Sequence, residues 1–251
     1  MNKFVRNFVP YRFWPSTLLR RWIERKDNRK VLSGPFKGMK YVSAAVGSSY
    51  EPKLLGTYEL ELHDHIFKLI SLNPRMIVDV GAAEGYYAIG MAIKCMNSQV
   101  IAFEANPSGR QLLTDMAKLN GVQEQVEIRS LCDVTALQDV FLQHSDASVL
   151  IMDVEGAEKQ LLDPTLVPQL FRSHILVEIH DYLDDELGDA IADRFASSHE
   201  IEKISIESRF VESYPFFIPF LLKVLFKNVF LDAICEYRHP NSRWFYLTPR
   251  R

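Results

Sequence analysis

Acidic side chains lie in or directly after several short apolar runs of this sequence, and one histidine lies among them. Apolar runs of about five residues, rich in β-branched side chains, are typical of buried strands in a parallel sheet. Because the carboxyl ends of parallel strands meet at one edge, we expect these side chains to gather there. They are Asp79, Glu104, Asp153, Glu155, Glu178, His180 and Asp181. Such an edge would attract a cation, and its imidazole could move a proton near neutral pH.

A glycine turn follows the first of these runs. Residues 76–80 predict a strand, Gly81 and Gly85 break it, and the apolar periodicity of residues 86–96 predicts a helix. Strand, tight glycine turn and helix together present a ligand site at the carboxyl edge of an open α/β sheet.

The side chains of this turn favour a cationic ligand over a dinucleotide. A dinucleotide site needs a third glycine and a small residue where helix and strand meet, but bulky Tyr86 occupies the sixth position here. Asp79 and Glu84 would repel a pyrophosphate, because like charges about 4 Å apart in a half-buried site interact by about 4 kcal/mol. S-adenosylmethionine carries a sulfonium and an ammonium and no phosphate, so it suits this turn.

The next apolar run, residues 99–103, ends at Glu104, and Asn106 and Pro107 then turn the chain into a predicted helix at residues 108–119. Glu104 lies about 20 residues beyond the glycines, the spacing at which a carboxylate accepts hydrogen bonds from both ribose hydroxyls. We therefore interpret Glu104 as a ribose-binding residue. The alternative is an acid that only ends a strand.

Five short stretches carry a resemblance to a known family. They are VDVGAAEG at 78–85, FEANP at 103–107, IMDVEGAE at 151–158, GPFKGM at 34–39 and LGTYE at 55–59. With these motifs the chain resembles the class I methyltransferases and, within them, the FkbM-type family. The likeness covers residues 34–182, and the stretch at 151–158 is its most specific part.

The resemblance implies both a fold and an activity. It implies an α/β, Rossmann-like, seven-stranded and mostly parallel sheet in the order 3-2-1-4-5-7-6, with helices on both faces. The strands predicted from the apolar runs are 76–80, 99–103, 126–131, 148–152, 175–179, 201–206 and 243–247. The implied activity is S-adenosylmethionine-dependent methyl transfer to a hydroxyl oxygen of a small molecule, a sugar or a lipid.

The same resemblance, together with the turn, assigns the cofactor-binding residues. They are Asp79, Gly81, Ala82, Gly85, Glu104, Ala105, Asp133 and Asp153. Asp133 follows the third predicted strand, where members of this fold often bind the adenine amine. An equally good interpretation makes Asp133 the N-cap of a helix at residues 136–143.

His180 is the predicted general base for a hydroxyl acceptor, because imidazole titrates near neutral pH and an adjacent carboxylate could orient it. Asp181 or Glu178 would be the orienting group, and Asp153 is assigned to catalysis together with His180. The alternative is that His180 caps the strand end or fills a polar pocket.

We expect no catalytic metal, although a divalent ion is conceivable. Asp153, Glu155, Glu178 and Asp181 offer oxygen ligands of the kind that Mg²⁺ and Ca²⁺ prefer. Carboxylates at strand ends are common in this fold, however, and their spacing here fits no fixed metal motif.

Composition indicates a soluble globular chain. Of 251 residues, 47% are apolar and 24% charged, which is ordinary for one α/β domain with added segments. Three cysteines lie far apart without a C-x-x-C pair, as in reducing compartments. No signal peptide is visible, and the longest uncharged apolar run, 214–222, is too short to span a membrane. We therefore expect a cytoplasmic protein with an option of peripheral membrane contact.

Two segments stand outside the family likeness. We expect an N-terminal extension at 1–33, and a methyltransferase domain at 34–251 with an insertion at about 209–241. Residues 1–40 hold eleven Lys/Arg and two acids, against eighteen and thirty in the rest. Residues 1–30 could cover the main domain, anchor it to a membrane surface or bind nucleic acid, which the acidic remainder disfavours.

The insertion also leaves several interpretations open. It could be satellite core, a lid over an apolar acceptor, an oligomer contact or a membrane-dipping element. Membrane contact is therefore an option for residues 1–30 or 214–230. The expected acceptor is a small molecule or glycan and not a nucleic acid. The alternative function is a non-catalytic, membrane-peripheral binding or assembly protein that retains a nucleoside pocket, and no oligomeric state is predicted.

Overall fold

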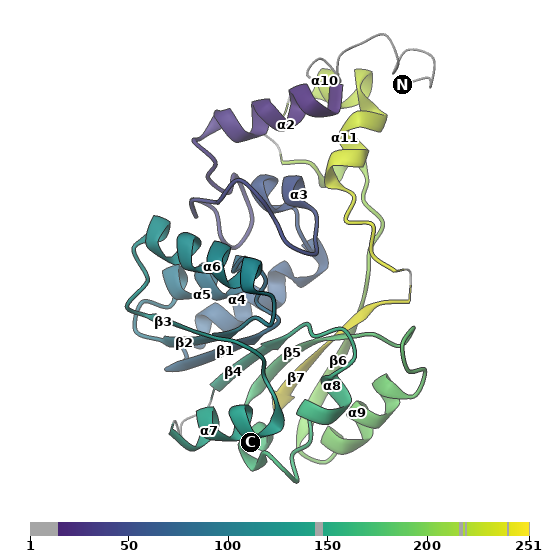
Figure 1. The fold of residues 1–251 in the computed structure, drawn as a ribbon. Helices are drawn as coiled ribbons and strands as arrows, with labels where there is room; N and C mark the ends of the chain where they lie inside the picture. The colour runs from purple at the N-terminus through teal and green to yellow at the C-terminus, as the bar shows by residue number, and fades with distance from the viewer. Residues whose placement is uncertain (1–14, 144–147, 216–217, 219, 240, 251) are drawn as a thin grey trace. The chain divides into compact units, whose positions relative to one another are not determined.

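The computed structural model describes residues 15–143, 148–215, 218, 220–239 and 241–250. The aromatic and basic residues predicted to form the start of the extension, 1–14, lie outside the described residues. The chain forms two compact units (Figure 1). We call residues 1–60 with 208–237 the helical unit, and residues 61–207 with 238–251 the sheet unit. The predicted boundaries at 33 and at 209–241 stay a prediction.

The sheet unit contains a seven-stranded sheet in the order β3-β2-β1-β4-β5-β7-β6, as the resemblance implied. All neighbours pair in parallel except β7, which runs antiparallel to both β5 and β6. The strands are β1 Met76–Val80, β2 Gln99–Phe103, β3 Val126–Arg129, β4 Ser148–Met152, β5 His174–Ile179, β6 His199–Ser205 and β7 Arg243–Pro249. The predicted fold class is therefore confirmed.

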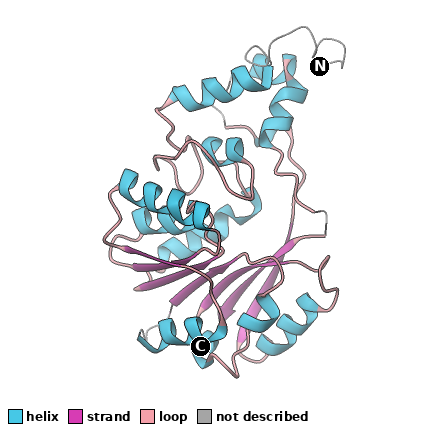
Figure 2. Ribbon diagram, viewed as in Figure 1, coloured by secondary structure: helices cyan, strands magenta, loops and turns pink. Residues whose placement is uncertain are grey.

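Helices cover both faces of this sheet (Figure 2). Helices α4, α5 and α6 lie on one face, and α7, α8 and α9 lie on the other (Figure 1). Their bounds are α4 His63–Ser71, α5 Tyr86–Lys94, α6 Pro107–Asn120, α7 Val134–Gln143, α8 Glu158–Leu161 and α9 Leu187–Phe195. Strands β1 and β4 are buried along their whole length, as expected for central strands covered on both faces. This burial explains why the apolar runs predicted them well.

In its described residues, the helical unit has four short helices and a 3₁₀ turn. They are α2 Pro15–Lys26, α3 Tyr50–Leu55, η4 Val211–Ser213, α10 Phe220–Leu225 and α11 Lys227–Ile234. Helix α11 packs against α2, α3 and α10, and its buried side chains are Phe230 and Ile234. An isolated antiparallel bridge joins Lys30 and Lys40 in this unit.

A buried ion pair within residues 208–237 also binds the backbone of the first segment of the helical unit. The Arg209 guanidinium donates to Glu236 Oε1 at 2.7 Å, and the Glu59 amide donates to the same oxygen at 3.2 Å. Among the described helices, none combines the length and apolar character needed to cross a bilayer.

Candidate active site

The first strand and the fourth strand come into backbone contact at the predicted turn. Gly81 has φ +87°, and a Cβ built on it would lie 1.7 Å from the carbonyl oxygen of Asp153. The Asp153 amide in turn donates to the Val80 carbonyl at 2.9 Å. Only glycine fits this combination of left-handed backbone and close approach. The spacing of the turn thus places Asp153 against the β1 end.

Gly85 begins helix α5 under a similar constraint. Its φ is +98°, and an added Cβ would lie 2.3 Å from Leu113 Cδ1 of α6. The glycine therefore lets α5 start directly behind the turn and pack closely on its neighbour.

Glu104 is fixed at the end of β2 by backbone amides. Its Oε2 accepts from the Ala83 amide at 2.7 Å, and its Oε1 accepts from the Asn106 amide at 2.7 Å. Gly109 makes room for the side chain, since a Cβ there would lie 2.8 Å from Glu104 Cγ. The carboxylate is buried and oriented, yet each of its oxygens keeps a second lone pair for a ligand.

The neighbours of Glu104 complete this part of the edge. The Ala82 amide donates to the Phe103 carbonyl at 2.9 Å, which ties the turn to β2. Ala105 is exposed, and its carbonyl accepts from Arg110 Nη1 at 2.7 Å. Asp79 within β1 and Glu84 in the turn are both buried. The turn is consequently lined by negative charge.

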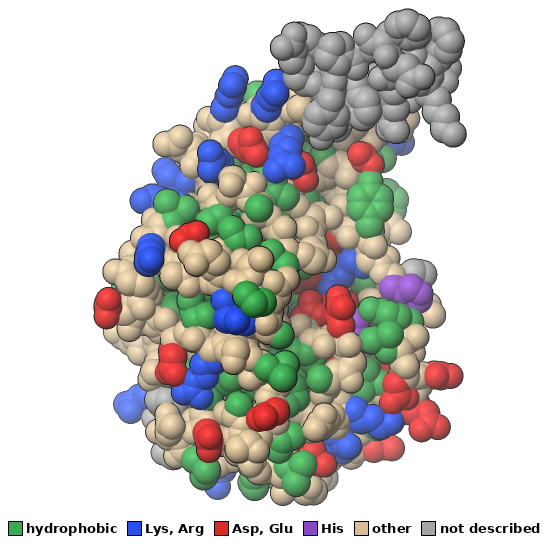
Figure 3. All heavy atoms as spheres, in the orientation of Figure 1, with side chains coloured by type: hydrophobic (Ala, Val, Ile, Leu, Met, Phe, Trp, Pro, Cys, Tyr) green, Lys and Arg blue, Asp and Glu red, His purple; other side chains and the backbone are tan. Residues whose placement is uncertain are grey.

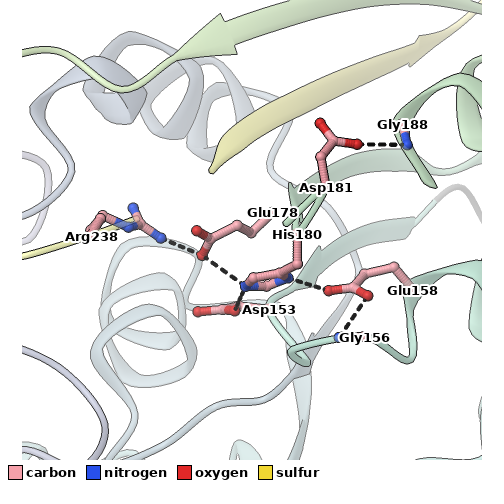
Figure 4. A network of polar contacts seen from close by, with 8 residues as sticks. All are labelled: Asp153, Gly156, Glu158, Glu178, His180, Asp181, Gly188 and Arg238. Atoms are coloured by element: carbon pink, nitrogen blue, oxygen red, sulfur yellow. Dashed lines mark hydrogen bonds and ion pairs between the residues drawn. The ribbon is translucent and has the colours of Figure 1, made fainter. Parts of the chain in front are cut away.

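His180 lies directly after β5 at the centre of a network of acidic side chains (Figure 4). Its Nδ1 donates to Oε1 of Glu158, a residue with no exposed surface at the start of α8. Its Nε2 faces Asp153 Oδ1 at 3.4 Å and Glu178 Oε2 at 3.8 Å. The other oxygen of Glu158 accepts from the Gly156 amide at 2.9 Å, which fixes the carboxylate.

Glu178, on β5, is engaged by a cation. Arg238 Nη2 donates to Glu178 Oε2, and the guanidinium carbon lies 5.6 Å from the centre of the Trp244 ring. Asp153, Glu178 and His180 each offer an atom within 4.8 Å of the others, as a metal site would. Because Arg238 already neutralises Glu178 and Glu158 engages His180, the absence of a catalytic metal stays our prediction.

The family model for the TRM5/TYW2 methyltransferase domain matches residues 57–206, which include β1 to β6, the glycine turn, Glu104 and the acids around His180. The chain belongs to this family. It is therefore an S-adenosylmethionine-dependent methyltransferase. A search among curated proteins finds no relative of the sequence. The finer resemblance to FkbM-type members stays a prediction.

Solved structures of other methyltransferases resemble the chain in fold. An O-methyltransferase of Bacillus cereus in complex with SAH has 14% identity and a TM-score of 0.43, covering 56% of this chain and 71% of that one. TYW2 of M. jannaschii in complex with AdoMet has 15% identity and a TM-score of 0.43, covering 76% and 74%. The B. subtilis M1A22 tRNA methyltransferase TrmK has 9% identity and a TM-score of 0.45, covering 74% and 64%. With TM-scores below 0.5, these likenesses say nothing about the acceptor.

The donor set of this methyltransferase fits its cofactor. Glu104 presents an oriented carboxylate of the kind that binds ribose hydroxyls. The buried acids Asp79 and Glu84 suit a ligand with a sulfonium and an ammonium group. Gly81 and Gly85, both at positive φ, form the tight turn between β1 and α5 at this edge of the sheet.

Asp133 takes the role that we weighed as its alternative. Its Oδ1 accepts from the Ala136 amide at 2.7 Å, so it caps the first turn of α7. The side chain is exposed. Binding of the adenine amine by its remaining oxygen stays a prediction.

The orienting partner of His180 differs from both predicted candidates. Asp181 points to Arg243 Nε at 2.7 Å and to the Gly188 amide at 3.0 Å, away from the imidazole Nδ1. Glu158 takes that position instead. It belongs to the family-specific stretch 151–158, but its spacing of 22 residues from His180 gave no local signal of contact.

The acidic surroundings determine the protonation of His180. Burial lowers the pKa of His180, but the hydrogen bond with Glu158 and the charges of Glu178, Glu158 and Asp153 outweigh it, so the pKa is raised above 6.5. The rings of Tyr182 and His180 make a T-shaped contact, with 5.6 Å between their centres. Burial and then the nearby acids, Glu155 first, raise the pKa of Tyr182 as well.

Proposed function

We propose that this methyltransferase transfers a methyl group to a hydroxyl oxygen of a small molecule, a sugar or a lipid, with His180 as the general base. The observation that carries the proposal is the buried pair of Glu158 and His180, which leaves Nε2 facing Asp153 at 3.4 Å. A base of this kind is needed for a hydroxyl, which loses a proton as its oxygen is alkylated. The FkbM-type resemblance supports the same class of acceptor.

The proposed cofactor site occupies the carboxyl edge around the β1 turn. Asp79, Gly81, Ala82, Gly85 and Glu104 would hold the nucleoside and amino acid parts, with Ala105, Asp133 and Asp153 at its border. When bound there, the cofactor supplies an electrophilic methyl group on a sulfonium. The chain's main task is then to hold donor and acceptor in line, because a direct displacement depends on position.

The proposed proton transfer uses the tautomer that Glu158 selects. When His180 is neutral with its proton on Nδ1, held by Glu158, Nε2 carries the lone pair and faces Asp153 Oδ1 at 3.4 Å. The proton that the acceptor hydroxyl loses on methylation would move to Nε2 of His180. Glu158 and Asp153 then stabilise the imidazolium that forms.

The test is turnover with a labelled methyl donor across hydroxyl compounds, comparing the wild-type protein with His180→Ala. We expect S-adenosylhomocysteine and an oxygen-methylated product, and at least a hundredfold lower kcat in the variant, since a general base typically contributes 10²–10⁴. Cofactor affinity, measured by calorimetry, should change little, which separates loss of the base from loss of the fold.

Each other outcome contradicts part of the proposal. A loss of kcat below tenfold in His180→Ala would show that His180 is not an essential general base. Cofactor binding without turnover on any acceptor would support the alternative of a non-catalytic, membrane-peripheral binding or assembly protein. Methyl transfer to RNA and to no hydroxyl compound would contradict both the small-molecule acceptor and the predicted absence of a nucleic acid partner.

A further inference from the structure

Helix α10 of the helical unit has its polarity reversed relative to an ordinary surface helix. Its lysine, Lys223, is buried with 8% of its surface exposed. Four apolar side chains of the helix are exposed, with exposed fractions of 73% for Phe220, 66% for Leu221, 51% for Val224 and 64% for Leu225. Surface helices normally turn their apolar side inward and their charges to water.

The buried lysine explains why the helix holds this orientation. Lys223 Nζ donates to the carbonyl of Tyr214 at 3.1 Å and lies 5.9 Å from the centre of the Tyr214 ring. The Tyr214 hydroxyl in turn donates to the carbonyl of Phe230 on α11. The polar chain from α10 to α11 thus fixes the apolar residues on the outside. Phe226, just beyond α10, is exposed and extends the apolar face.

The helical unit, to which this apolar face belongs, is positively charged. The helical unit contains fifteen Lys/Arg and seven acids, a net charge of +8, whereas the sheet unit has a net charge of −11. Helix α2 exposes Arg21, Arg25 and Lys26, and Figure 3 shows Lys and Arg side chains gathered over this helix. On the same helix Leu18 and Trp22, four residues apart, are also exposed.

We propose that the apolar face of α10 docks the protein on an anionic lipid surface. We call Phe220, Leu221, Val224, Leu225 and Phe226 the α10 face. Exposed aliphatic and aromatic side chains beside Lys and Arg are the combination that inserts into the headgroup region of anionic membranes.

Two other partners for the α10 face, RNA and a second copy of the chain, fit the observations less well. RNA would use the positive charge but gains nothing from exposed Leu and Val, since it is bound through phosphates and stacked bases. A second copy would bring two units of +8 together, and like charges oppose that association. The lipid surface is the one partner that uses both the apolar face and the charge.

The test is flotation of the full-length protein with vesicles of phosphatidylcholine alone or with 30% phosphatidylserine, without cofactor or acceptor. We expect binding to the anionic vesicles and at least tenfold weaker binding to neutral ones. The double variant Leu221→Glu, Leu225→Glu should lose at least tenfold in affinity for anionic vesicles. Because both positions are exposed, the variant should keep its fold, which unfolding curves would check.

Matched variants separate the α10 face from general surface effects. Leu142→Glu changes an exposed leucine of α7 in the sheet unit and should leave vesicle binding unchanged. Arg21→Glu, Arg25→Glu should weaken binding to anionic vesicles only. The proposal would be overturned by equal loss in Leu142→Glu, by RNA binding without vesicle binding, or by an α10 variant that turns a dimer into a monomer without affecting vesicles.

Discussion

At the scale of single residues, the pair of Glu158 and His180 sets the pH range of the proposed reaction. The folded-state pKa of His180 is raised above 6.5, so the neutral base appears only as the pH rises past that raised value. The same shift bears on stability. Protonated His180 contributes stability that is fully present below about pH 6.5 and is lost as the pH rises through the folded pKa.

Glu158→Gln tests this role directly. The amide oxygen can still accept from Nδ1, while the amide nitrogen would face the Gly156 N–H. The negative charge is gone, so the pKa of His180 should fall. We expect the rising limb of kcat/KM against pH to move to lower pH and kcat to drop about tenfold, as the imidazolium loses its partner. Asp181→Gln, next to His180 but bonded to Arg243, is the control and should leave the limb in place. An unchanged pH dependence of kcat/KM in Glu158→Gln would contradict a positioning role for Glu158.

Glu104→Gln tests the cofactor site. Two backbone amides donate to the two oxygens of Glu104, and a glutamine can accept only one of these bonds. We expect the dissociation constant for S-adenosylmethionine, measured by calorimetry, to rise at least tenfold, with about 1–3 kcal/mol lost from the free energy of unfolding. The exposed Glu124→Gln is the matched control. An unchanged affinity of Glu104→Gln for S-adenosylmethionine would contradict ribose binding by Glu104.

At the scale of elements, the contact between the β1 turn and the end of β4 makes a prediction about stability. Gly81→Ala places a Cβ 1.7 Å from the Asp153 carbonyl at a positive φ, so the strand ends must separate. We expect a loss of at least about 3 kcal/mol in the free energy of unfolding. Gly121→Ala, at φ +72° with nothing within 4 Å of the new Cβ, should cost only about 1 kcal/mol. Urea unfolding of both variants would show this, and equal losses would contradict it.

Only the parts of the site that depend on local sequence signals could be predicted from the sequence. The turn at 81–85 and the position of Glu104 were predictable, because glycine spacing and strand ends are local signals. The Glu158–His180 and Arg238–Glu178 pairs were not, because each joins residues far apart in sequence, 60 positions in the second case. The direction of Asp181 was missed for the same reason, since Arg243 comes from the last strand.

At the scale of the whole molecule, charge is divided between the two units. The sheet unit, with its net charge of −11, contains the acidic edge that suits a cationic cofactor, and the helical unit carries the positive charge. Counting charge over the whole chain gives −3, which hides this division. The division could be suspected from the basic first 40 residues. That residues 208–237 join them in one unit required the structure, because long-range packing carries no local signal.

The strand order limits how much of the sheet can form while the protein is being synthesised on the ribosome. Strand β7, residues 243–249, is the sheet's only link to β6 and lies between β5 and β6. A nascent chain that has emerged only to residue 242 therefore has β5 with an open edge and β6 without a neighbour to pair with. Exposed strand edges favour aggregation, and such long-range pairing is slow. Strand β7 follows β6 along the chain and joins it to β5, so chaperone dependence should concentrate in the interval before β7 has emerged.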